Sequence, residues 1–308
     1  MNNWILFVVI ATLLDSSRIF IDNYSSDVYF KGRGAVSQKL VYGYALIIIP
    51  IILSIFLKFD FPPEYAWNYF LFFVTGLLSG LAGIPYFKAL ELDDSTNIGI
   101  FTQLAPVLYL ILGWIFLDEH FSPFQLLAFV FIIIAPLIIV MTTKKRSRKI
   151  KIRAIIYALF YVFIAVVGNL IFVKENVPEI NFLIEIVFVL LGKGVSDLII
   201  VYTRHRWVKR FKVVLKESHG KVLRPLILNS IIGFVKDIFY RLALITAPTV
   251  AIASAASDSA EPIVIFFLGI LFTLLWPKFG REKLDRKTIL VHLVATVFVV
   301  IGIVLLQI

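Results

Sequence analysis

Apolar residues are gathered into ten long runs that polar or proline-containing stretches separate. Each run is close to the roughly 20 residues that an α-helix needs to cross the hydrocarbon core of a bilayer. The pattern therefore predicts an all-α integral membrane protein with ten transmembrane helices. The predicted helices cover residues 3–22, 38–57, 67–89, 95–117, 124–142, 153–173, 181–202, 225–245, 249–275 and 288–307.

The composition agrees with this pattern and excludes several kinds of site. Of the 308 residues, 60% are hydrophobic and 16% are charged, whereas about a quarter of the residues of a soluble domain are charged. The absence of Cys excludes disulfides and thiolate metal sites. No Ser-His-Asp array and no phosphate-cradling loop is recognisable. We therefore expect no metal, no cofactor and no enzymatic activity.

The charge distribution predicts an orientation in the membrane. The net charge is +10, and the basic residues fall in the loops that follow odd-numbered helices. Because Lys and Arg are retained on the cytoplasmic side, these loops are expected in the cytoplasm and both termini outside. The chain is expected to be a multi-pass plasma membrane protein that does not bind nucleic acid. The basic loops are 31–39, 144–153, 204–224 and 278–287.

The longest of these loops, 205–224, alternates basic and large apolar residues. This spacing is typical of an amphipathic helix lying on an anionic leaflet, and a solvated linker is the other interpretation. The apolar members are Trp207, Phe211, Val214 and Leu215.

The two halves of the chain share ordered landmarks. In each half a Tyr-x-x-Ala-Leu motif precedes a Pro, then a Trp, then a Glu, and a final apolar helix follows. The sequence therefore predicts two five-helix repeats, 1–143 and 153–308, joined by a basic linker at 144–152. An odd number of helices makes such repeats inverted, an architecture that permits alternating access to a midplane site. The landmarks are Tyr86, Pro106, Trp114 and Glu119, then Tyr240, Pro262, Trp276 and Glu282.

These motifs resemble the EamA-type repeat of the drug/metabolite transporter superfamily. The first copy consists of Tyr86-x-x-Ala89-Leu90, Pro106-Val107 and Trp114-x-x-Leu117-Asp118-Glu119, and the second copy is weaker. The resemblance implies a ten-helix basket with a central cavity. It also implies that helices 1–4 and 6–9 line the cavity and that helices 5 and 10 are peripheral.

Ionisable residues inside the predicted helices are the candidates for a solute or proton pathway. Such residues are costly in a bilayer, by about 2.5–3.5 kcal/mol on insertion scales, and usually face a cavity or a partner. Most of them fall in the second half. The candidates are Asp15, Arg18, Glu185, Lys193, Asp197, Lys236, Asp237, Arg241, Asp258 and Glu261.

Two hypotheses account for these residues. Lys193 and Asp197 are one helical turn apart, as are Asp237 and Arg241, so each pair could neutralise itself and simply hold the bundle together. Alternatively, the cations attract an anionic or zwitterionic solute and a carboxylate carries a proton. Asp258 and Glu261 share a helix face, and two close carboxylates suit a proton relay.

The sequence therefore predicts a secondary transporter of a small polar or amphipathic metabolite, acting in efflux or exchange. Its expected partners are the lipid bilayer and a small-molecule solute. The chain is expected to be a monomer or a homodimer. A lipid-handling membrane protein and a non-transporting receptor or scaffold are the alternatives. The small residues Gly76, Gly80 and Gly83 are expected to let helices approach closely.

Overall fold

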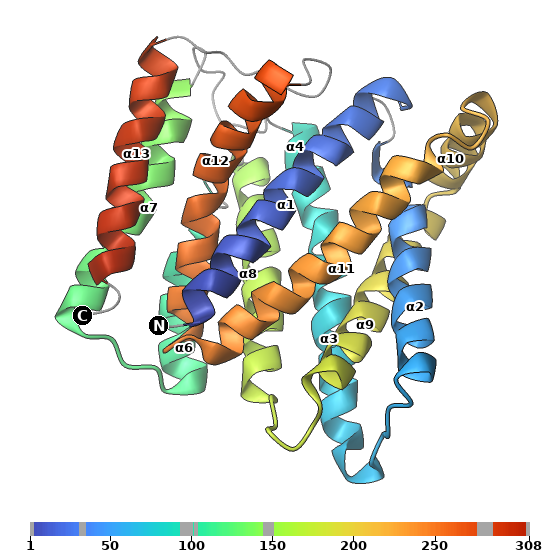
Figure 1. Cartoon of the computed structure of the whole chain (residues 1–308), viewed down its shortest axis with the longest axis horizontal. Helices are drawn as coiled ribbons and strands as arrows, with labels where there is room; N and C mark the ends of the chain where they lie inside the picture. The colour runs from blue at the N-terminus through green and yellow to red at the C-terminus, as the bar shows by residue number, and fades with distance from the viewer. Residues whose placement is uncertain are drawn as a thin grey trace. The chain divides into compact units, whose positions relative to one another are not determined.

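The computed structural model describes most of the chain as α-helix, and its described residues contain no strand (Figure 1). The described residues are 3–30, 35–92, 101, 104–143, 151–275 and 286–305. Several predicted features lie outside these ranges. They are most of the basic linker (144–150), the loop at 276–285 with Trp276 and Glu282, and the loop residues 31–34.

Each of the ten predicted ranges contains an observed helix, with ends that differ by a few residues. The exceptions are the first helix, which is longer, and the fourth, which is described only at residue 101 and from residue 104. The helices are α1 (Asn3–Val28), α2 (Lys39–Phe56), α3 (Ala66–Leu81), α4 (Gly83–Leu92), α6 (Ala105–Leu117), α7 (Pro123–Thr143), α8 (Ile152–Lys174), α9 (Phe182–Tyr202), α10 (His205–Glu217), α11 (Leu223–Thr246), α12 (Val250–Leu275) and α13 (Arg286–Leu305). Short 3-10 helices cover Ala35–Gln38 and Pro63–Tyr65.

The third predicted helix is divided in two. The helix α3 ends at Leu81 and α4 begins at Gly83. A proline ring clashes with the carbonyl group four residues earlier, and for Pro85 that carbonyl belongs to Leu81. The proline therefore accounts for the break, which the expected continuous helix at 67–89 did not include.

Within the described residues, five helical stretches are long and apolar enough to cross a membrane. They are Asn3–Val28, Val36–Phe56, Pro63–Ala89, Ile152–Lys174 and Val250–Phe272. Three shorter apolar stretches are Ala105–Leu117, Pro123–Ala135 and Ile289–Leu305. The helices α9 and α11 have comparable lengths but carry several charged residues. The protein is therefore an all-α membrane protein with multiple apolar helices.

The chain folds into two compact units. Unit 1 contains residues 1–17, 82–170 and 239–308, and unit 2 contains residues 18–81 and 171–238. Each unit takes segments from both halves of the sequence, so the units are a different division from the two predicted repeats.

In unit 1, α7 packs along α13 (Figure 1). Ala135 of α7 joins Ala295 and Val299 of α13 and Ile263 of α12 in one buried cluster. The contact is close, because a Cβ atom at Gly302 would lie 2.5 Å from the Ile132 side chain and 3.2 Å from the Ala128 carbonyl oxygen.

In unit 2, α9 packs against both α2 and α3 (Figure 1). Glycines form the contact with α3. A Cβ atom at Gly76 would lie 1.8 Å from the Val189 carbonyl oxygen, and one at Gly192 would lie 2.0 Å from the Phe73 carbonyl oxygen. A Cβ atom at Gly80 would lie 1.6 Å from the Ser196 hydroxyl oxygen. The predicted packing role of Gly76 and Gly80 is confirmed, because a side chain at Gly76 would overlap the backbone of α9 and one at Gly80 would displace Ser196.

The loop at 205–224 contains the helix α10, so the linker interpretation is wrong for residues 205–217. Three of its apolar side chains are covered by the protein, whereas Val213 is exposed. Val208, Phe211 and Val214 are buried together with Phe30, Leu40, Val201, Val222 and Leu226. Arg210 also donates a hydrogen bond of 3.2 Å to the Phe30 carbonyl oxygen. The apolar face of α10 therefore packs on unit 2.

Candidate functional site

A buried ion pair joins α9 to α11 in unit 2. The Lys193 ammonium group donates to Asp237 Oδ2 at 2.8 Å, and Lys236 Nζ lies 3.6 Å from Asp237 Oδ1. Side-chain exposure is 22% for Lys193 and 7% for Asp237. Three of the predicted residues are thus brought together at one place in the helix bundle.

A second ion pair joins α9 to α2. Lys39 donates a hydrogen bond to Asp197 Oδ1. Lys193 and Asp197, which could have neutralised each other along α9, therefore have partners on other helices. Sequence spacing shows only which groups could meet within one helix, whereas tertiary packing decided these partners.

A chain of hydrogen bonds connects α1, α2 and α11 in the same unit. Arg18 Nε donates to the Asn229 side-chain oxygen at 3.0 Å, and the Asn229 amide nitrogen lies 2.7 Å from Asp22 Oδ1 and 2.8 Å from the Tyr42 hydroxyl. Tyr42 also donates to Asp22. Only Arg18 was predicted. Asp22 was treated as the end of the first helix, and the longer α1 places it in this network.

Glu185 lies at the start of α9, apart from the two ion pairs of that helix. It lies in the first turn of α9 and its side chain is buried. The Asn176 side-chain nitrogen donates to both of its carboxylate oxygens, at 3.1 and 2.9 Å. Asn181 caps the same helix by accepting from the Leu183 backbone N–H. Glu185 therefore joins the turn after α8 to the start of α9.

A cluster of tyrosines lies in unit 1. The Asn169 amide donates to the Tyr109 hydroxyl at 2.6 Å and to the Tyr240 hydroxyl at 3.4 Å, and Tyr240 lies 3.5 Å from the Ser254 hydroxyl. The rings of Tyr86 and Tyr161 are 5.0 Å apart. These side chains come from α4, α6, α8, α11 and α12, so the cluster is built at the meeting of five helices.

The predicted carboxylates of α12 border this cluster. Asp258 and Glu261 are both electrostatic neighbours of the Tyr161 hydroxyl. Both side chains are partly buried, as is Asp15, and Arg241 is buried. Aromatic hydroxyls beside carboxylates can hold a solute by stacking and by hydrogen bonds.

Glu119 meets the N-terminus of α12. Its Oε1 accepts a hydrogen bond of 2.5 Å from the Val250 N–H, and the Thr249 hydroxyl accepts one of 3.1 Å from the Ile252 N–H. Burial raises the pKa of Glu119 above its ordinary value of 4.5, and the Val250 and Ala251 N–H groups lower it by a smaller amount. A carboxylate is favourable at a helix N-terminus.

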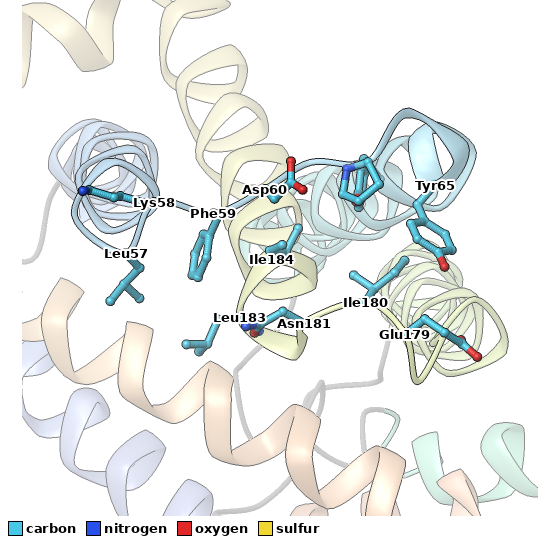
Figure 2. A pocket seen from close by; sticks show the side chains of 12 residues that line it. Leu57, Lys58, Phe59, Asp60, Tyr65, Glu179, Ile180, Asn181, Leu183 and Ile184 are labelled. Atoms are coloured by element: carbon cyan, nitrogen blue, oxygen red, sulfur yellow. The ribbon is translucent and has the colours of Figure 1, made fainter.

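A cavity of about 540 Å³ lies in unit 2 between the loop after α2 and the loop before α9. Figure 2 shows Lys58 and Glu179 at opposite ends of this opening, with Asn181 and Ile184 between them. Lys58 has a left-handed backbone conformation with φ of 49°, which turns the chain after α2. The cavity is therefore lined by loop and helix-end residues, away from the two ion pairs of α9.

Residues 34–141 match the EamA-like transporter family. The chain carries an EamA-like transporter segment. This match confirms the resemblance predicted from the motifs, over about a third of the chain. The EamA-like segment contains Lys39 and Tyr42 of unit 2, and Tyr86, Tyr109 and Glu119 of unit 1.

A solved crystal structure of a protein has a fold similar to that of this chain over nearly its full length. The two chains are 14% identical, the similarity covers 98% of this chain and 96% of that chain, and the TM-score is 0.65. No curated protein matches the sequence. In the described part of the chain, no group of three or more Asp, Glu or His side chains could hold a metal ion.

The tyrosines of the unit 1 cluster are functional candidates that the sequence patterns did not predict. Tyr86 and Tyr240 were noticed only as landmarks of the repeat, and the structure places both in the unit 1 cluster. Their recurrence was the available signal. Tyr109, Tyr161 and Ser254 gave none, because an isolated Tyr or Ser in an apolar helix is usually a packing residue.

Proposed function

We propose that this protein is a secondary transporter that carries a small polar or amphipathic metabolite across the plasma membrane, in efflux or exchange. Transport proceeds by alternating access to a midplane cavity in a ten-helix, inverted-repeat fold. The observation that carries the proposal is the match of residues 34–141 to the EamA-like transporter family. The five apolar helical stretches among the described residues agree with it.

The composition of the two units supports the inverted repeat. In unit 2, the segment 18–81 is combined with the segment 171–238. The first residues of these segments differ by 153 positions (18 and 171) and their last residues by 157 (81 and 238), close to the 154 positions between Tyr86 and Tyr240. A pseudo-two-fold axis brings equivalent segments together in this way.

Several helix contacts inside the units also join equivalent helices of the two proposed repeats. In the order of the ten predicted helices, α2 is the second and α9 the seventh, and these two pack together. The fourth and ninth helices, α6 and α12, also pack together, as do the fifth and tenth, α7 and α13. Each pair joins a helix of the first repeat to its counterpart in the second. These three contacts support repeats at 1–143 and 153–308, whereas the contact of α3 with α9 joins the third helix to the seventh, which are not counterparts.

The buried polar groups supply the chemistry that the proposed transporter needs. The unit 1 cluster offers stacking surfaces and hydroxyls for the body of a solute, with Asp258 and Glu261 beside them to exchange a proton. The ion pairs of unit 2 supply cations for an anionic group on the solute. Because such groups are costly in a bilayer, they are retained where they bind or where they hold the bundle together.

The proposal is tested first by binding. The purified chain is heated with each member of a metabolite panel at pH 6 and pH 8, and the melting temperature is recorded. A transporter of this kind is expected to be stabilised by one chemical class of small solute, with an effect that differs between the two pH values. Stabilisation by lipids alone would contradict the proposal in favour of a lipid-handling protein.

The matched variants are Tyr240→Phe and Tyr157→Phe. Tyr240 belongs to the unit 1 cluster, whereas Tyr157 contacts Lys88 through its ring. Removing the Tyr240 hydroxyl is expected to weaken solute stabilisation, and removing the Tyr157 hydroxyl is expected to leave it unchanged. Equal effects of the two changes would exclude the unit 1 cluster as the solute site.

A further inference from the structure

The helix α10 has two faces with different surroundings. One face is covered by the protein, through the buried residues Val208, Phe211 and Val214. On the opposite face, Lys209, Lys212 and Lys216 are all exposed. At 100° per residue these three lysines fall within one arc of about 60°. The buried apolar residues of α10 are thus used in packing, and a strip of cations faces outward beside the exposed Val213.

The ends of the neighbouring helices place this strip at the edge of the bilayer. Ile199 and Tyr202, in the last turn of α9, are exposed, as are Ile227 and Leu228 near the start of α11. In a membrane protein, exposed large apolar residues near a helix end face hydrocarbon chains. Ile227 is four residues, or about 6 Å, from the start of α11. The segment between the two helices therefore lies at the level of the lipid headgroups.

The first turn of α10 has the residues typical of that level. The guanidinium groups of Arg204 and Arg206 lie 5.1 and 5.7 Å from the centre of the Trp207 ring. Tryptophan is enriched at the membrane–water interface, and arginine binds phosphate through a planar fork of donors. The segment 204–224 contains eight Lys and Arg residues against one acidic residue, Glu217.

We propose that the outward face of α10 binds the phosphate groups of anionic phospholipids. The principal contacts are Lys209, Lys212 and Lys216, with Arg206 at the start of the helix. Charge complementarity selects anionic over zwitterionic headgroups, and the level of the strip selects membrane lipids over soluble phosphates. Because the apolar face is packed on unit 2, lipid binding would hold α10 and the helix ends that it covers at the membrane surface.

The test measures lipid affinity in the full-length chain. The chain in neutral detergent is titrated with short-chain phosphatidylglycerol, and binding is followed by tryptophan fluorescence. Phosphatidylcholine and glycerol 1-phosphate are titrated in parallel. The triple variant Lys209→Gln/Lys212→Gln/Lys216→Gln is expected to bind phosphatidylglycerol at least about tenfold more weakly, because each interfacial cation contributes to attraction.

Two further variants keep the result interpretable. The triple variant Lys144→Gln/Lys145→Gln/Lys149→Gln removes the same charge from another basic loop and is expected to keep its affinity within about twofold. Glu217→Gln removes the single acidic group from the segment and is expected to strengthen binding. Each variant is first shown to elute as a monodisperse species.

Three results would overturn the proposal. The first is unchanged affinity in the α10 triple variant. The second is an equal loss in the 144–149 triple variant, which would indicate attraction by net charge alone. The third is equal binding of glycerol 1-phosphate, which would indicate a site for a soluble phosphate ester rather than for lipid.

Discussion

Asp237 lies between two lysines, and this arrangement makes its ion pair asymmetric. Lys193 Nζ is 2.8 Å from one carboxylate oxygen and Lys236 Nζ is 3.6 Å from the other. Loss of Lys193 leaves a carboxylate that still has a cation beside it. Loss of the carboxylate leaves two cations close together in the helix bundle. Removal of the Asp237 carboxylate is therefore expected to destabilise the protein more than removal of the Lys193 ammonium group.

Asp237→Asn is expected to lower the free energy of unfolding by about 3 kcal/mol, because removing one partner of a buried pair leaves an uncompensated charge. Lys193→Met is expected to cost clearly less, and the double variant is expected to recover part of the loss caused by Asp237→Asn. The free energies of unfolding of the two single variants and the double variant are measured by thermal and denaturant-induced unfolding in detergent. Equal losses in the two single variants would contradict this asymmetry.

Glu119 gives a prediction about pH. Its pKa is raised in the folded chain, so the folded state binds the proton more tightly than the unfolded state does. Its contribution to stability is fully present below pH 4.5, the ordinary pKa, and is lost as the pH rises through the raised value. In Glu119→Gln the side-chain oxygen still accepts a hydrogen bond from the Val250 N–H. This variant is therefore expected not to lose stability as the pH rises. Melting temperatures of both proteins between pH 4 and pH 8 test this, and parallel curves would contradict it.

At the scale of the helix, α3 and α9 of unit 2 approach each other closely at two glycines. At Gly76 and Gly192 the atoms that a Cβ would meet belong to the backbone of the opposite helix. Backbone atoms cannot move away as a side chain can, so these two glycines fix the distance between the helices. Gly233 differs, because its potential neighbour is the flexible guanidinium of Arg18, at 2.9 Å.

Gly76→Ala and Gly192→Ala are each expected to destabilise the protein by about 3 kcal/mol, the upper end of the cost of overpacking. Gly233→Ala is the matched control and is expected to cost clearly less, about 1 kcal/mol, because a Cβ there meets the end of a side chain, although the Arg18 hydrogen bond to Asn229 must readjust, and because Ala favours the helix. The melting temperature of each purified variant tests the ranking. A Gly233 variant that is as unstable as the Gly76 variant would contradict it.

The helices themselves could largely be predicted from the sequence, because the length of an apolar run directly reflects the thickness of the bilayer. The break at Leu81 was visible in Pro85 but was not used. The buried charges were also found, since each is an exception within an apolar run. Their partners could not be found, because the meeting of Lys39 with Asp197 depends on how α2 packs on α9. The tyrosine cluster was missed for the same reason.

At the scale of the whole molecule, the proposed repeats and the loop charges together define a topology. Loops after odd-numbered helices are expected in the cytoplasm and those after even-numbered helices outside. The chain contains no Cys, so single cysteines can be introduced without first removing a native cysteine. The loop after the fourth helix and the basic linker after the fifth are therefore convenient positions for a test.

Asp118→Cys, in an exposed turn before α7, is expected to react with a membrane-impermeant maleimide in intact cells. Ser147→Cys, in the basic linker, is expected to react only after the cells are permeabilised. The two variants control for each other, because the same reagent is used for both and only the predicted side of the membrane differs. Labelling of Ser147→Cys in intact cells, with Asp118→Cys protected, would contradict the proposed orientation.

Transport itself is tested most directly by counterflow. The purified chain is reconstituted in liposomes loaded with unlabelled solute of the class that stabilises it, and uptake of labelled solute is followed at pH 6 and pH 8, with Asp258→Asn beside the unaltered chain. Alternating access predicts a transient, saturable accumulation of label that requires internal solute, and Asp258→Asn is expected to lose its pH dependence. Binding of the solute with no uptake above that of protein-free liposomes would contradict the proposal that this protein is a transporter.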